Sequence, residues 1–119
     1  MGENDIKVEL SEQFALKIVN CYNSLCNEKK EYIMSKQLLR SGTSIGANIA
    51  ESLYAESDDD FVHKLKIAQK EASETRFWLK LLYRSGYLHD SLYAMLNRDC
   101  DSILRILTSI IKTMKNKNP

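Results

Sequence analysis

The stretch that decides the fold of this 119-residue chain reads Arg40-Ser41-Gly42-Thr43-Ser44-Ile45-Gly46-Ala47-Asn48-Ile49-Ala50-Glu51. Its apolar residues recur at helical spacing, because Leu38, Ile45 and Ile49 fall near one face and Gly42 occupies the gap in that face. The stretch therefore predicts a helix that packs against other helices.

Small residues form a ridge along this helix, at Gly42, Gly46 and Ala50. An isolated glycine in a helix costs roughly 1 kcal/mol relative to alanine, so two glycines need a structural reason. We expect that reason to be the close approach of another backbone. Together with broad apolar surface near the C-terminus, at Leu104, Ile106 and Ile111, the ridge predicts association between copies.

A polar stripe runs along the same helix and consists of Arg40, Ser44, Asn48 and Glu51. Apolar and small residues flank it on both sides, so we expect it to be partly buried and paired. Glu51, together with Glu71 or Glu74 further along the chain, is a candidate partner for Arg40 or Arg76. The alternative is a wholly solvated helix face.

Four helical segments are expected, at about residues 10–27, 31–54, 57–84 and from 89 onward. The third has the clearest seam, with a 4-3-4-3-4-3 repeat of Phe61, Leu65, Ala68, Ala72, Thr75, Leu79 and Leu82. Short connections between four helices predict an all-α, single-domain, up-down-up-down antiparallel four-helix bundle over residues 10–115. Residues 1–9 are expected to be a flexible segment and residues 116–119 a polar tail.

Local signals bound the third helix. Ser57 precedes Asp58, Asp59 and Asp60, which gives an N-cap followed by carboxylates where the helix dipole favours them. Arg84 and Gly86 are typical of a helix end. A cap is a better interpretation of the acid run than a metal site, because adjacent carboxylates on a helix point in different directions.

The composition excludes several classes of protein. Charged residues make up 28% of the chain and hydrophobic residues 44%, as in ordinary helical domains. Cys21, Cys26 and Cys100 are odd in number and lack framework spacing, which argues against a secreted disulfide scaffold. Residues 1–5 are acidic where a signal peptide would be basic, and no apolar run approaches 18 residues. We expect a cytoplasmic protein with no membrane partner.

The sequence contains no recognisable catalytic motif, neither a P-loop, a Rossmann fingerprint, a nucleophile elbow nor a His-Glu-x-x-His pair. A di-iron bundle needs Glu-x-x-His, and neither His63 nor His89 has a glutamate three residues before it. The histidines are interpreted as surface or cap residues and Cys21 as core filling. We expect a non-enzyme with no metal and no cofactor.

Charge is unevenly distributed although the net charge is +1. Residues 1–90 carry 12 Lys and Arg against 14 Asp and Glu, and residues 91–119 carry 5 against 2. The candidate nucleic-acid contacts are Arg98, Arg105, Lys112, Lys115 and Lys117. Their convergence on one rim would favour phosphate binding. Sequence-selective base stacking is not expected, because no aromatic residue follows Tyr93.

Two stretches together resemble the family of 23S rRNA intervening-sequence proteins. The first block covers residues 37–42 and 44–52 of the central helix, and the second covers residues 67–79, Ile-Ala-Gln-Lys-Glu-Ala-Ser-Glu-Thr-Arg-Phe-Trp-Leu. The resemblance extends over about residues 10–115. The chain departs from the family pattern at Gly46 and Ser52, where members often have proline and glycine.

The resemblance implies a left-handed four-helix bundle that assembles as a homopentameric ring. Some members of the family are encoded inside inserts in ribosomal RNA genes. A related protein is the accessory factor of diversity-generating retroelements, a basic pentamer that binds reverse transcriptase and nucleic acid. We therefore expect a non-catalytic, homo-oligomeric binding or scaffold protein whose partner is RNA, DNA or a nucleic-acid enzyme. The alternative is a protein–protein adaptor without nucleic-acid contact.

Overall fold

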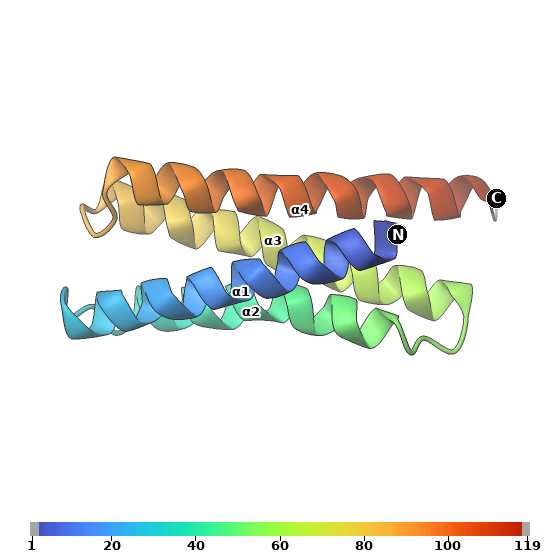
Figure 1. The fold of residues 1–119 in the computed structure, drawn as a ribbon, viewed down its shortest axis with the longest axis horizontal. Helices are drawn as coiled ribbons and strands as arrows, with labels where there is room; N and C mark the ends of the chain where they lie inside the picture. The colour runs from blue at the N-terminus through green and yellow to red at the C-terminus, as the bar shows by residue number, and fades with distance from the viewer. Residues whose placement is uncertain (1–2, 118–119) are drawn as a thin grey trace.

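Four antiparallel helices make up the described part of the chain. The computed structural model describes the backbone of residues 3–117 and the side chains of residues 6–117. The helices are α1 (Glu3–Asn27), α2 (Met34–Ser52), α3 (Asp58–Arg84) and α4 (Asp90–Lys117). They run alternately up and down a molecule 48 Å long, with α1 and α2 in one layer and α3 and α4 in the other (Figure 1).

Each helix contacts its two neighbours around the bundle. The backbones of α1–α2, α2–α3, α3–α4 and α1–α4 come close together, whereas over their described lengths the backbones of the diagonal helices do not. This confirms the predicted up-down-up-down antiparallel four-helix bundle. Within residues 3–117 none of the helices combines the length and apolar character needed to cross a bilayer.

The core follows the predicted seams. Six of the seven seam residues of α3 are buried, and Phe61 packs against the core from its edge. Leu38, Ile45 and Ile49 of α2 are fully buried, and Cys21 fills a small site among them, as expected. The apolar periodicity of the sequence therefore maps directly onto one continuous core.

The start of α1 differs from the prediction. α1 begins at Glu3 rather than near residue 10, so residues 3–9 of the segment that was expected to be flexible are helical. The side chain of Lys7 is fully buried, and its ammonium lies 5.5 Å from the centre of the Phe61 ring. The contact with Phe61 packs the first turns of α1 against α3. The polar sequence of these turns does not predict such a contact.

Local capping and turn geometry set the start of α2 and both ends of α3. α2 starts at Met34, because the Glu31 side chain occupies the position of a cap before it. α3 starts as predicted, with the Ser57 hydroxyl accepting from the Asp60 amide at 3.0 Å. It ends at Arg84, and Gly86 follows with φ of +86°, a conformation that glycine adopts without strain. α4 continues through Lys117, which is further than the predicted bundle end at residue 115; residues 118 and 119 of the predicted tail lie outside the described part.

The glycine ridge faces a helix of the same chain. A Cβ atom on Gly42 would lie 2.9 Å from Cγ1 and Cγ2 of Ile18, and one on Gly46 would lie 3.3 Å from the Ser11 carbonyl oxygen. The expected close approach of another backbone is present, and α1 supplies it. Ala50, in contrast, is exposed.

The apolar surplus of α4 is also used within the chain. Ile111 is buried, and Leu104 and Ile106 pack against the core. Most of the two features from which association was predicted is thus used inside the bundle, with Ala50 exposed and Leu104 and Ile106 partly buried.

Candidate nucleic-acid interface

The two halves of the sequence differ in net charge. Residues 1–57, which include α1 and α2, have 6 Lys and Arg against 8 Asp and Glu. Residues 58–119, which include α3 and α4, have 11 against 8. The basic excess predicted for residues 91–119 is therefore part of a larger basic region, because α3 packs beside α4.

Ion pairs between the layers increase the difference in unpaired charge between them. Lys17 of α1 lies 2.6 Å from Asp99 of α4. Arg40 of α2 binds two carboxylates of α3, Glu71 at 3.0 Å and Glu74. Two cations of the α1–α2 layer thus pair with three acids of the α3–α4 layer. In the opposite direction, Lys64 of α3 pairs with Glu51 of α2 at 3.2 Å.

The Arg40 pairs are the ones expected from the polar stripe. The Trp78 indole also donates to Glu74 at 3.1 Å, and this bond together with Arg40 lowers the pKa of Glu74. The hydrogen bond to Glu74 is also the main cause that raises the pKa of Arg40. The Arg40 side chain is 50% exposed, so these pairs hold α2 to α3 with the modest strength of surface pairs, about 0–1 kcal/mol each.

The rest of the stripe bonds to its own helix or to a different partner. Ser44 donates to the Arg40 carbonyl at 2.6 Å, and Asn48 donates to the Ser44 carbonyl at 2.8 Å. Both side chains are half-buried, whereas Glu51 is exposed and pairs with Lys64 instead of Arg40 or Arg76. The two ends of the stripe, Arg40 and Glu51, therefore link α2 to α3, while its middle bonds within α2. The stripe is less buried than predicted.

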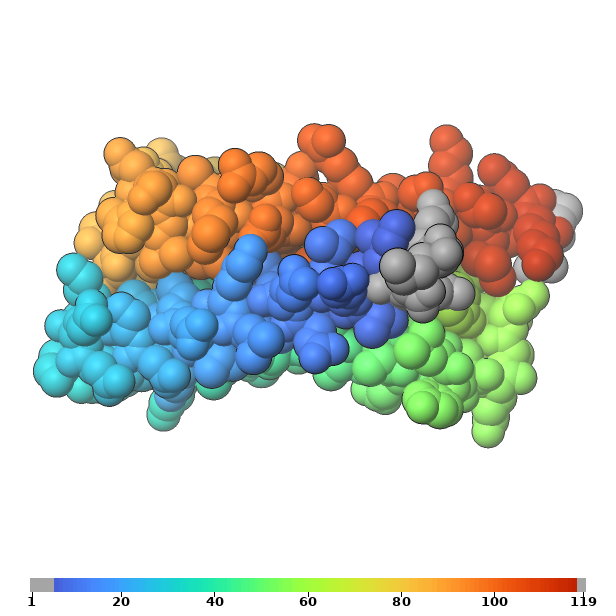
Figure 2. All heavy atoms as spheres, in the orientation of Figure 1, coloured from blue at the N-terminus to red at the C-terminus, as the bar shows by residue number. Residues whose placement is uncertain are grey.

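The five candidate cations of α4 do not converge on one rim. Arg98, Arg105 and Lys112 are seven residues apart, which aligns them in one exposed row along the outer face of the helix. Figure 2 shows side chains of α4 projecting from that edge of the molecule. Lys115 instead borders a hollow of about 340 Å³ beside the acidic start of α3, and Lys117 lies near the end of the helix.

Arg105 is the member of the row that forms an ion pair within the described part of the chain. Its Nε lies 3.0 Å from Asp101, and the same carboxylate lies 3.7 Å from Arg76 of α3. Asp101 therefore stands between two arginines and neutralises at most one of them.

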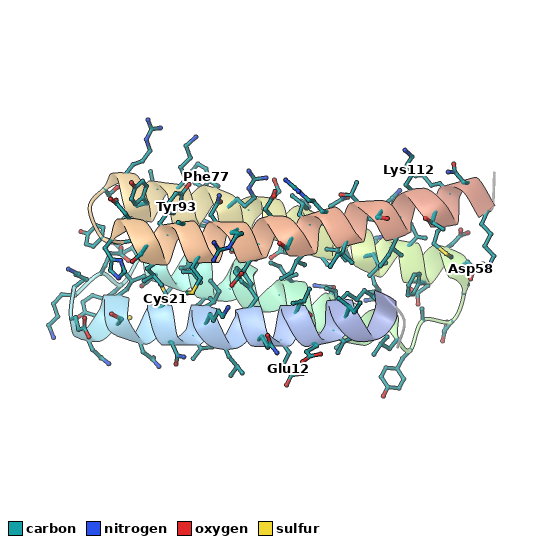
Figure 3. All side chains as sticks on the ribbon, turned by 45° about the horizontal axis from the view of Figure 1, so that its top comes forward. Glu12, Cys21, Asp58, Phe77, Tyr93 and Lys112 are labelled. Atoms are coloured by element: carbon teal, nitrogen blue, oxygen red, sulfur yellow. The ribbon has the colours of Figure 1, made fainter. Side chains whose placement is uncertain are left out.

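A groove between α3 and α4 lies beside this carboxylate. Its volume is about 400 Å³, and its lining consists of Ser73, Arg76, Phe77, Lys80, Tyr93 and Asn97. Figure 3 places Phe77 and Tyr93 close together near one end of the α3–α4 layer. The sequence reasoning missed this groove, because it considered only aromatic residues that follow Tyr93. The outward position of Phe77 on α3, away from the seam, was the signal that could have found it.

The cysteines and histidines have structural roles. Burial raises the pKa of Cys21 to about 11 and that of Cys100 to about 12, so both thiols stay protonated near neutral pH. The His89 ring accepts from the Leu92 amide at 3.2 Å and caps α4, as expected for a cap histidine. Within residues 6–117, no three His, Cys, Asp or Glu side chains gather in a way that could hold a metal ion.

The comparison with known families decides what the chain is related to. The model for 23S rRNA-intervening sequence protein matches residues 3–109. The chain belongs to the 23S rRNA-intervening sequence protein family.

A solved structure is similar to this chain in both sequence and fold. It is a protein of unknown function from the S23 ribosomal protein family of Bacteroides thetaiotaomicron VPI-5482, with 50% sequence identity. The match covers 93% of this chain and 99% of the other, with a TM-score of 0.92. No curated protein matches this member of the 23S rRNA-intervening sequence protein family.

Proposed function

We propose that this protein is a non-catalytic, homo-oligomeric scaffold that binds nucleic acid through the outer surface of its α3–α4 layer. The observation that carries the proposal is the pattern of ion pairs. Lys17 and Arg40 of the other layer engage three acids of the α3–α4 layer, Asp99, Glu71 and Glu74. These three acids therefore compete less with phosphates for the exposed cations of their own layer, such as those of the α4 row.

Exposed apolar side chains support association through the opposite layer. Seven large apolar side chains are exposed on α1 or on the connections at the two ends of α2, namely Ile6, Leu16, Val19, Tyr32, Ile33, Leu53 and Tyr54. Among the described residues of the α3–α4 layer two large apolar side chains are exposed to this degree, Phe77 and Leu81, and both are on α3. Copies that meet through the α1–α2 layer leave the basic layers free, and a ring repeats that positive surface once per copy.

Binding of this kind is expected to be steeply salt-dependent and indifferent to sequence, because it rests on release of counterions from phosphates. The test measures binding of generic RNA and DNA by fluorescence anisotropy between about 50 and 200 mM salt. Arg98→Gln combined with Lys112→Gln removes two exposed cations of the α4 row. If each of these cations contacts a phosphate, the slope of log K against log salt falls by about 1.4–1.8.

The matched control is Lys29→Gln combined with Lys36→Gln, which removes two exposed cations from the α1–α2 layer. This variant is expected to bind like the parent protein. Equal losses in both double variants would mean that only net charge matters. Absence of salt-dependent binding in the parent protein would favour the alternative, an adaptor that binds proteins and no nucleic acid.

A further inference from the structure

The groove between α3 and α4 has a lining that suits one kind of ligand. Its six lining residues include two cations, Arg76 and Lys80, and no carboxylate. Ser73, Tyr93 and Asn97 add uncharged hydrogen-bonding groups beside them. A concave site with cations and no acid favours an anion, and its polar groups can bind a neighbouring uncharged part of the same ligand.

The aromatic ring of Phe77 gives the groove a stacking surface. The residue is 55% exposed although its neighbours on the seam are buried. Its ring lies 5.0 Å from the Trp78 ring at an angle of 76°, so an aromatic neighbour supports it. An exposed, supported aromatic ring beside cations is the arrangement on which proteins stack unpaired bases.

The cations of the groove are available for a phosphate. Arg76 lies 3.7 Å from Asp101, beyond ordinary hydrogen-bond distance, whereas Arg105 lies 3.0 Å from the same carboxylate. Lys80 is exposed, and no carboxylate within the described residues forms an ion pair with it. Both side chains therefore keep donors for a ligand.

The wall of the groove that α4 provides is fixed by contacts of Tyr93. Tyr93 stacks on Tyr83 with ring centres 4.2 Å apart and planes within 3° of parallel. The Tyr83 hydroxyl donates to Asp90 at 2.8 Å, and this bond raises the pKa of Tyr83. The wall that faces Phe77 is thus fixed before a ligand arrives, which lowers the entropic cost of binding.

A second hollow continues the groove along α3. It has a volume of about 220 Å³, and its lining is Phe77, Lys80, Leu81 and Arg84, so the two hollows share Phe77 and Lys80. Arg76 and Arg84 lie eight residues apart, which is about 12 Å along the helix axis. One free nucleotide would engage part of this track, whereas a strand with successive phosphates can engage all of it.

We propose that this track binds a single-stranded segment of nucleic acid, with one unpaired base stacked on Phe77 and its phosphate held by Arg76 and Lys80. The inference rests on the proposed function and makes it more specific, since a duplex keeps its bases paired and cannot offer one to Phe77. It also revises the expectation that base stacking plays no part.

The test compares a single-stranded oligonucleotide containing 2-aminopurine with a duplex of the same sequence, at low salt. Phe77→Leu keeps an apolar side chain and removes the ring. In this variant, affinity for the single strand is expected to fall about 5- to 100-fold, the range for loss of one stacked base. Quenching of 2-aminopurine fluorescence on binding is expected to disappear, while duplex affinity stays unchanged.

The control is Tyr22→Leu, which removes a half-buried aromatic ring from α1, in the other layer, at a residue that neither proposal uses. Oligomeric mass is measured for all three proteins. If Phe77→Leu alters neither the quenching nor the single-strand affinity while salt-dependent binding persists, the stacking site is wrong and the proposed function stands. If a free nucleotide binds as tightly as the strand, the binding track along α3 that is longer than one nucleotide is wrong. If the parent protein binds no nucleic acid, both proposals are wrong.

Discussion

Glu31 determines where α2 begins. Its carboxylate accepts from the backbone amides of Ile33, Met34 and Ser35 at 3.1, 2.9 and 2.8 Å. Burial by itself would raise the pKa of Glu31, but the three amide bonds outweigh burial and lower it. The residue directly before the helix, Ile33, has no side chain that could cap it, so Glu31 supplies the missing acceptor from two residues further back.

Glu31→Gln is expected to lower the free energy of unfolding by about 1–2 kcal/mol at neutral pH, the usual worth of a helix cap. Because the pKa of Glu31 is lower in the folded protein, the stabilisation is complete above the unfolded pKa of about 4.3. It disappears as the pH falls through the lowered folded pKa. Denaturant titrations at several pH values measure the difference from the parent protein.

Glu28→Gln is the control for this substitution, because Glu28 is exposed and accepts only from the Ser24 hydroxyl in the structure described. A loss that is equal for Glu28 and Glu31, or independent of pH, would contradict the capping role.

At the scale of the helices, the contact between Gly42 and Ile18 fixes how closely α1 approaches α2. A methyl group on Gly42 would meet the branch atoms of Ile18 at 2.9 Å, and these atoms cannot swing away like the end of a long side chain. Overpacking of a core costs about 1–3 kcal/mol, and replacement of a helical glycine by alanine returns roughly 1 kcal/mol.

Gly42→Ala is therefore expected to lower stability by up to about 2 kcal/mol, measured by denaturant unfolding. Ile18→Ala creates the space that the new methyl group needs. The double variant is expected to lose less than the sum of the two single losses, because the alanine methyl then fills part of the cavity. Additive losses would show that the two residues do not limit the approach of the helices.

The helices could be predicted from the sequence because their seams are local patterns, such as the one from Phe61 to Leu82. The start of α1 could not, because it depends on Lys7 meeting Phe61, which lies 54 residues away and on another helix. The cations of the basic row on α4 could be found in the sequence, because residues 91–119 contain more Lys and Arg than Asp and Glu. The groove could not, because Phe77 and Tyr93 meet only after α3 and α4 pair.

At the scale of the whole molecule, the proposed association between copies predicts that the exposed apolar side chains of the α1–α2 layer become buried. Leu16 is 61% exposed on the outer face of α1, with Val19 nearby on the same helix. Burial of such a side chain between copies contributes about 1.5–3 kcal/mol, and a ring repeats the contact at every interface. The family resemblance implies five copies.

Light scattering of the parent protein at micromolar concentration is expected to give a mass near five times 13.7 kDa. Leu16→Glu places a charge in the proposed contact and is expected to shift the mass towards that of one chain. Leu81→Glu, the same change on α3, is the control and is expected to leave the mass unaltered. A monomeric parent protein, or dissociation by the control alone, would contradict association through the α1–α2 layer.

The ion pairs between the layers have a consequence for diffusion. The net charge of +1 suggests a molecule to which a distant polyanion is almost indifferent. Because residues 58–119 carry 11 Lys and Arg and residues 1–57 only 6, with 8 Asp and Glu in each half, the chain instead carries an electric dipole across its thickness. In the field of a polyanion this dipole turns the molecule before any contact is made, so that productive orientations are sampled more often than random tumbling would allow. A chain of almost zero net charge can thus meet a polyanion in a preferred orientation.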